Sequence, residues 1–139
     1  MSEGIVLYGF GDNDRSGKVR WTARELGLAV EERRVSLGDN RRPPYRDLNP
    51  YGAVPTTIFR GQTLIESTAT CSWLAEQIPE AGLVVLPGEE GRWDYLHWMA
   101  IFGESLEGKL VEFVLAKFGV LPPAHGELVG PFLGSRLKA

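Results

Sequence analysis

The chain has a single cysteine, Cys71, among 139 residues, so it cannot close an internal disulfide. A lone cysteine suits a reducing compartment, and we expect a cytoplasmic protein. The first residues, MSEGIVLYGF, have no basic start and only a short apolar run, which is not the pattern of a secretory signal. No stretch reaches the roughly 18 consecutive apolar residues of a membrane span, so we expect no membrane partner.

A surplus of positive charge is also lacking, since 15 lysines and arginines face 18 aspartates and glutamates, a net charge of −3. Both signs are mixed along the chain, which argues against a surface that binds nucleic-acid phosphates. The two histidines, His97 and His125, lack the spacing and the companions of metal ligands, so we predict no metal site.

The first half of the chain contains short elements separated by turn residues. A compact apolar run at residues 5–10 predicts a buried strand, and the loop GDNDRSG follows it. We expect Ser16 to cap the next helix, which buries one face and ends at Gly27. Residues 30–37 predict a second strand, and the charged centre of this strand, EERR, is typical of a sheet edge.

A loop with Arg41 and Arg42 separates these elements from the next ones. Strands at 56–59 and 63–65 are expected to form a hairpin around Gly61-Gln62, followed by a helix over 67–78. The order is strand, helix, strand, then strand, strand, helix. This α/β order is the thioredoxin-like arrangement, in which a right-handed crossover fixes a parallel pair and the hairpin adds antiparallel strands.

The second half of the chain differs in pattern. Residues 81–90 read as a linker between a first domain over 1–80 and a partial helical region over 91–139. Residues 91–118 predict one long helix, or two helices broken near Gly103 or Gly108, with apolar side chains over more than one face. From residue 119 on, prolines and glycines predict little helical order.

The most informative segment is residues 48–76, LNPYGAVPTTIFRGQTLIESTATCSWLAE. Pro55 has no N–H and suits the start of a strand, and we predict that the Val54–Pro55 bond is cis. Ser67 opens a helix whose first N–H groups can bind an anion, and we expect its side chain to cap that helix. Together these features predict a sheet edge that receives a peptide-like ligand beside a carboxylate site.

This segment resembles the glutathione-binding half of the glutathione transferase family. The family patterns NPxGxVPxL and ESxAIxxYL appear here as NPYGAVPTT and ESTATCSWL. LYGFGDNDRSGKVRWTARELGL is similar to the family's first strand, active-site loop and first helix. The resemblance covers residues 4–80 well and residues 90–118 loosely, and the chain looks truncated relative to the family.

The resemblance implies a fold and a ligand. The fold is a thioredoxin-like domain followed by a short, incomplete all-α extension. The ligand is glutathione, which serves as cosubstrate without a separate cofactor and is conjugated to an electrophilic small molecule. The backbone of Val54, before Pro55, would pair with the cysteinyl part of glutathione. Glu66 would face the ammonium of the γ-glutamyl end, and Ser67 would take its carboxylate.

The catalytic residue implied by the resemblance lies in the loop after the first strand. Asn13 aligns with the family's hydrogen-bond donor to the thiol, and Ser16 is the second candidate. The alternative is that Asn13 is a turn residue and Ser16 a helix cap. Arg41 and Arg42 are candidates for the glycyl carboxylate, or else solvated loop charges.

Two further expectations follow from the resemblance. Family dimers pair through the helix that corresponds to residues 91–118, so we expect a homodimer. The missing helices and the Asn at the donor position also leave open a non-catalytic binding or assembly module, or a truncated remnant. The sequence does not identify the electrophile.

Overall fold

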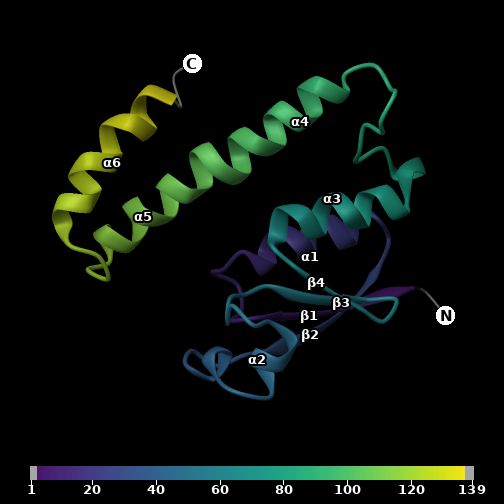
Figure 1. The fold of residues 1–139 in the computed structure, drawn as a ribbon, viewed down its shortest axis with the longest axis horizontal. Helices are drawn as coiled ribbons and strands as arrows, with labels where there is room; N and C mark the ends of the chain where they lie inside the picture. The colour runs from purple at the N-terminus through teal and green to yellow at the C-terminus, as the bar shows by residue number, and fades with distance from the viewer. Residues whose placement is uncertain (1–2, 137–139) are drawn as a thin grey trace. The chain divides into compact units, whose positions relative to one another are not determined.

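A computed structural model describes residues 3–136 of the chain (Figure 1). The chain forms two compact units, one ending at Leu86 and the other beginning at Pro87, and this boundary lies inside the expected linker. Within the described residues no helix is both long enough and apolar enough to span a membrane.

The first unit contains a four-stranded sheet in the order β2-β1-β3-β4. Strand β1 pairs parallel with β2 and antiparallel with β3, and β3 pairs antiparallel with β4. The strands are β1 (Gly4–Gly9), β2 (Ala29–Arg34), β3 (Thr56–Phe59) and β4 (Gln62–Ile65). The charged strand β2 lies at a sheet edge, as predicted from its sequence.

Three α-helices accompany the sheet, with α1 and α3 on one side and the short α2 on the other (Figure 1). They are α1 (Ser16–Glu25), α2 (Tyr45–Leu48) and α3 (Ser67–Gln77), and 3₁₀ turns cover Asp39–Arg41 and Pro79–Ala81. This order and topology confirm the predicted thioredoxin-like fold.

The core of the first unit lies between the sheet and helices α1 and α3. Helix α1 contributes the predicted apolar stripe, because Val19, Ala23 and Leu26 are all buried there. They meet Leu7 from β1 and Leu74 from α3, which are also buried. The 3.6-residue period of the stripe is therefore what orients α1 on the sheet.

The hairpin turn lies one residue earlier than predicted. Phe59 pairs with Gln62, so the two turn residues are Arg60 and Gly61 rather than Gly61 and Gln62. Both turn residues have positive φ, 49° and 77°. A two-residue turn that matches the twist of the flanking strands needs positive φ at both positions, which Gly61 accepts without steric cost.

The second unit is helical throughout most of its length. Its elements are α4 (Arg92–Ala100), a π-helical segment (Ile101–Leu106), α5 (Glu107–Lys117) and α6 (Pro123–Arg136). The first three run on as one continuous helical rod (Figure 1). We expected one long helix or two helices broken near Gly103 or Gly108. The structure is closer to one long helix, with a π-segment around Gly103 in place of a break.

The prediction of little helical order after residue 119 is wrong, because α6 occupies most of this region. Pro123 opens the helix, where a missing N–H costs nothing. Gly126 and Gly130 face α5: a Cβ built on them would lie 3.3 Å from the Ala116 Cβ and 3.5 Å from the Phe113 ring. These glycines therefore permit close packing of α6 against α5, whereas the sequence analysis interpreted them as helix breakers.

Candidate functional site

The sheet register brings three loops and turns to one end of the sheet. Thr56 at the start of β3 pairs with Tyr8 near the end of β1 and with Ile65 at the end of β4. The loop after β1, the segment before β3 and the start of α3 therefore all lie at this end. They carry Asn13, Val54 and Glu66-Ser67, respectively, so most of the predicted site residues converge.

The loop after β1 folds back on the carboxylate of Asp14. That carboxylate accepts hydrogen bonds from the N–H groups of Phe10 (2.6 Å), Gly11 (3.1 Å) and Ser16 (2.5 Å). A carboxylate that accepts several backbone N–H groups makes strong, charge-assisted bonds. Asp14 thus fixes the loop. The tip of the loop presents Asn13, whose side chain is exposed.

Ser16 does not cap α1 as expected. It is the first residue of the helix and is fully buried, and its N–H is bound by Asp14 instead. Its hydroxyl donates to the carbonyl oxygen of Gly11 (3.3 Å). The Ser16 side chain approaches the end of β1 so closely that Gly9 is required there, because a Cβ on Gly9 would lie only 2.6 Å from the Ser16 Oγ. The Ser16 hydroxyl therefore points into the loop.

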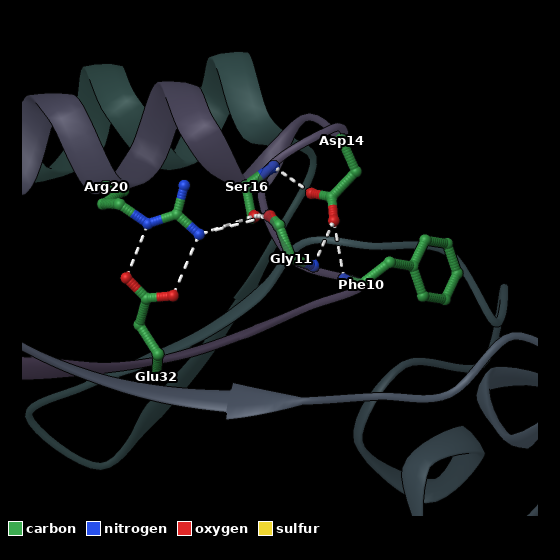
Figure 2. A network of polar contacts seen from close by, with 6 residues as sticks. All are labelled: Phe10, Gly11, Asp14, Ser16, Arg20 and Glu32. Atoms are coloured by element: carbon green, nitrogen blue, oxygen red, sulfur yellow. Dashed lines mark hydrogen bonds and ion pairs between the residues drawn. The ribbon is translucent and has the colours of Figure 1, made fainter.

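Arg20 on α1 joins this loop to strand β2 (Figure 2). Its Nε and Nη2 donate to the two carboxylate oxygens of Glu32, at 2.6 Å and 3.0 Å. Its Nη2 also lies 3.3 Å from the Gly11 oxygen and 3.5 Å from the Ser16 Oγ. The hydrogen bond with Arg20 lowers the pKa of Glu32, and the same bond raises the pKa of Arg20.

The Val54–Pro55 peptide bond is cis, as predicted. Pro43–Pro44 is also cis, which the sequence analysis did not predict. Val54 is half-buried, and neither its N–H nor its carbonyl oxygen has a hydrogen-bond partner among the residues that the structure describes. A backbone with an unused donor and acceptor next to the start of a strand can pair with an extended ligand.

Buried side chains from α2 and the residue after it hold the backbone just before Val54. The Tyr45 hydroxyl donates to the Ala53 oxygen (2.6 Å) and shares a hydrogen bond with the Thr56 hydroxyl (2.7 Å). The Asn49 Nδ2 donates to the Ala53 oxygen (3.0 Å) and to the Thr56 hydroxyl (3.1 Å). Burial is the main cause that raises the pKa of Tyr45, so its phenol stays a neutral donor.

A similar clamp holds the residue before Ala53. The Asn40 Nδ2 donates to the Gly52 oxygen (2.5 Å). Gly52 has φ of +62°, and a Cβ there would lie 2.8 Å from the backbone carbonyl oxygen of Asn40. Sequence reasoning missed Tyr45 and Asn40. Asn49 was in the NP motif, but no role was assigned to it.

The start of α3 provides the second half of the site. Ser67 is buried and is the first residue of the helix, not its cap, and no side chain caps the helix. The Thr70 N–H is bound to the Glu66 oxygen (2.8 Å), so the preceding N–H groups have no acceptor within the helix. Such a helix start attracts an anion.

Glu66 stands directly before this helix with an exposed side chain and φ of +65°. Positive φ is uncommon for a residue with a Cβ and costs about 1–3 kcal/mol when the backbone is strained. Backbone strain of this kind is concentrated at ligand-binding positions. Glu66 therefore combines an unusual backbone conformation with a place directly before the open N–H groups of α3.

Arg41 and Arg42 are exposed, in and after the 3₁₀ turn that precedes α2. Arg42 lines a surface cleft of about 740 Å³ together with Tyr8 and Tyr45. No hydrogen bond or ion pair ties either arginine side chain to Val54 or Ser67 within the described residues. Their assignment to a carboxylate stays a prediction.

The mixed sheet with α1 and α3 on one face, and with a cis Val54–Pro55 bond at the start of β3, defines a thioredoxin-like domain. The glutathione S-transferase N-terminal domain matches residues 7–82, which is more than half of the chain. The chain belongs to the glutathione S-transferase family.

Two relatives and two solved structures illustrate the similarity. Protein LigF of Sphingobium sp. is 33% identical over 87 residues, covering 61% of this chain and 34% of that protein. Maleylpyruvate isomerase of Ralstonia sp is 28% identical over 142 residues, covering 97% of this chain and 66% of that protein. This chain thus spans two thirds or less of the length of these relatives.

Among solved structures, a glutathione transferase from Methylococcus capsulatus str. Bath has a TM-score of 0.82 at 27% identity, covering 96% of this chain and 66% of that one. The theta class glutathione S-transferase of Xanthomonas axonopodis pv. citri, solved with glutathione bound, has a TM-score of 0.71 at 28% identity. That match covers 82% of this chain and 55% of the other.

Proposed function

We propose that the chain binds glutathione at the end of the sheet where Val54, Glu66 and Ser67 converge, and conjugates it to an electrophilic small molecule. The observation that carries the proposal is the unused N–H and carbonyl of Val54 beside the open helix start at Ser67. Glutathione is a short extended peptide with a carboxylate and an ammonium at one end. It acts as cosubstrate, and no separate cofactor takes part.

The three parts of glutathione find matching groups. The cysteinyl N–H and C=O pair antiparallel with the Val54 backbone, which is a one-residue strand addition next to Pro55. The γ-glutamyl carboxylate accepts hydrogen bonds from the N–H and hydroxyl of Ser67, and the γ-glutamyl ammonium pairs with Glu66. Arg41 or Arg42 takes the glycyl carboxylate.

Asn13 is our first candidate to face the sulfur. Its side-chain amide donates an N–H to the glutathione thiolate, and the start of α1 adds a positive potential. The thiol proton leaves to solvent, and the sulfur then forms a bond to an electrophilic carbon while a leaving group departs with its electron pair. Activation is modest, because a neutral amide stabilises an anion weakly and Asp12 lies next to it. Ser16 is the second candidate.

Calorimetric titration of glutathione into wild type and Ser67→Ala tests the binding site. The substitution is expected to weaken binding by about 1–2 kcal/mol, or roughly tenfold, which is the size of a charge-assisted hydrogen bond. Ser72→Ala on the same helix is the matched control, because Ser72 lies beyond the helix start and bonds to the Thr68 oxygen (3.1 Å). Equal weakening by both substitutions would contradict the assignment.

A non-catalytic glutathione-binding module is the second candidate function. The inward-pointing Ser16 hydroxyl favours it, because of the two candidate donors only Asn13 is then exposed at the loop tip. Conjugation of glutathione to chlorodinitrobenzene separates the two functions. A rate above the uncatalysed background supports the transferase, whereas binding without rate enhancement supports the module.

We also propose that the protein is a cytoplasmic homodimer that pairs through α4 and the π-segment. The single cysteine suits a reducing compartment. The dimer is supported by an aromatic row in which Trp93, Trp98 and Phe102 are 74%, 55% and 59% exposed. Trp98 and Phe102 stack with ring centroids 5.7 Å apart. Such a row favours an interface, and a two-fold pairing would cover it on both subunits.

A further inference from the structure

Arg20 is unusually buried for a charged residue of a surface helix. Its side chain is 12% exposed, whereas that of its partner Glu32 is 46% exposed. Glu32 binds both Nε and Nη2, which fixes the plane of the guanidinium. In this plane Nη2 points at the loop after β1, where it reaches the Gly11 oxygen and the Ser16 Oγ (Figure 2).

The two contact points of Nη2 stand at the two ends of the loop tip, residues 12–15, which carries the exposed Asn13. Gly11 has φ of +132°, a conformation that side chains rarely permit. Its carbonyl oxygen accepts from both Arg20 and the Ser16 hydroxyl, each at 3.3 Å. The contacts of Arg20 therefore bracket the tip and do not touch Asn13 itself.

An ion pair between strand and helix would not by itself require this arrangement. Arg60 and Glu3 form a comparable two-point pair between β1's start and the hairpin turn, at 2.5 Å and 2.9 Å. Both of those side chains are about half exposed. The further hydrogen bond of Arg60 goes to the Gln77 side-chain oxygen (3.4 Å), and within residues 3–136 no loop carbonyl accepts from Arg60. Surface pairs of that kind contribute little to stability. The pair Arg20–Glu32 differs in being directed at a functional loop.

We propose that Arg20, oriented by Glu32, is a positioning residue that holds the loop tip so that the Asn13 amide meets the glutathione sulfur. The inference rests on the proposed glutathione transferase function and extends it to a residue outside the binding site. Glutathione itself is held by Val54, Glu66 and Ser67. Loss of Arg20 therefore affects thiolate stabilisation and leaves binding largely intact.

The first test compares Arg20→Gln and Arg20→Lys with the matched control Arg60→Gln. With chlorodinitrobenzene, Arg20→Gln is expected to lower kcat about tenfold or more, while KM for glutathione changes less than about threefold, because misplacement of a catalytic group costs rate before binding. The thiol pKa of bound glutathione, followed by ultraviolet absorbance, is expected to rise. Arg20→Lys keeps the charge and is expected to recover part of both losses.

Unchanged kcat and thiol pKa in Arg20→Gln would overturn the proposal. So would equal losses in Arg20→Gln and Arg60→Gln, because these would follow from stability alone. A double variant adds a sharper comparison: Arg20→Glu with Glu32→Arg reverses the ion pair but removes the donor from position 20. It is expected to stay as impaired as Arg20→Gln, and full recovery would show that the ion pair alone suffices.

A second measurement does not depend on glutathione. Amide hydrogen exchange at Phe10, Gly11 and Ser16 reports the loop directly, because the N–H groups of these residues are bound by Asp14. Arg20→Gln is expected to speed this exchange about tenfold, the effect of one lost charge-assisted hydrogen bond, with no change in Arg60→Gln. Unchanged exchange in Arg20→Gln would contradict the role of Arg20 even if glutathione binds. Absence of glutathione binding to wild type would contradict only the proposed function.

Discussion

Tyr45 is a buried side chain that fixes the backbone on both sides of Val54, which we propose to bind glutathione. Its hydroxyl is shared between the Ala53 oxygen and the Thr56 hydroxyl, on either side of Val54–Pro55. Val54 therefore stands between two anchored residues. The N–H and carbonyl oxygen of Val54 belong to the backbone, so their position is set by these anchors on neighbouring residues and not by the Val54 side chain.

We predict that Tyr45→Phe destabilises the first unit by about 1–3 kcal/mol, because the buried Thr56 hydroxyl and the Ala53 oxygen each lose a donor or acceptor. Urea unfolding followed by fluorescence measures this free energy. Tyr51→Phe is the control, since the Tyr51 side chain is exposed. Equal effects of the two substitutions would contradict the anchoring role.

We predict that Tyr45 also makes the unfolding free energy of the first unit depend on pH. Burial raises the pKa of Tyr45 above its ordinary value of 10.0, so the folded state favours the neutral phenol. Its contribution to the unfolding free energy is present below pH 10.0 and is lost as the pH rises through the raised pKa. Wild type should therefore lose more stability than Tyr45→Phe in this alkaline range.

Residue-level prediction from the sequence succeeded where a motif carried the position. The cis bond at Val54–Pro55 and the placement of Ser67 at a helix start were both predicted. The two predicted helix caps, Ser16 and Ser67, are wrong, because the Ser16 N–H donates to the Asp14 carboxylate and no side chain caps α3. Hydrogen bonds to backbone carbonyls, such as that of Tyr45, leave no pattern in the sequence.

At the scale of elements, the β3–β4 hairpin sets the geometry of the site. Its register places Thr56 opposite Ile65, so the residues before and after this pair share one end of the sheet. The register in turn depends on the two-residue turn at Arg60-Gly61. A one-residue slip would send the side chains of β4 to the opposite face.

We predict that Gly61→Ala destabilises the protein by about 1–2 kcal/mol, because φ of +77° places the new Cβ against the following carbonyl. Gly108→Ala is the opposite case: Gly108 lies in α5, has an ordinary helical φ, and a Cβ there meets no atom within 4 Å. It is expected to stabilise by about 0.5–1 kcal/mol. Thermal unfolding of both variants measures the contrast, and a shared sign would contradict it.

The prediction of helices and strands was reliable where the period of apolar residues determines the element. It failed where contacts with another helix determine it. The strands, α1 and α3 follow from apolar patterns, and so does the long helix from residue 91. Helix α6 does not, because its glycines and Pro131 have poor intrinsic helix propensity. Its stability comes from the buried Val129 and Leu133 and from close contact with α5.

At the scale of the whole molecule, we predict that the aromatic row of α4 and the π-segment forms the interface of a homodimer. Light scattering is expected to give twice the chain mass of 15.4 kDa. Trp98→Ser is expected to shift the protein toward monomer, because it removes an exposed aromatic ring from the row. Trp21→Ser is the control, since Trp21 is similarly exposed on α1. A monomer for wild type would contradict the dimer.

Glutathione binding at the convergent end of the sheet is the central claim, and chemical-shift mapping of the isotope-labelled chain tests it most directly. Titration with reduced glutathione is expected to move the backbone N–H signals of Val54, Glu66 and Ser67 together with the side-chain amide signal of Asn13. The signals of the Arg60-Gly61 turn, at the opposite end of the β3–β4 hairpin, should stay in place. An unchanged spectrum at millimolar glutathione, or shifts confined to residues away from this end of the sheet, would contradict the account.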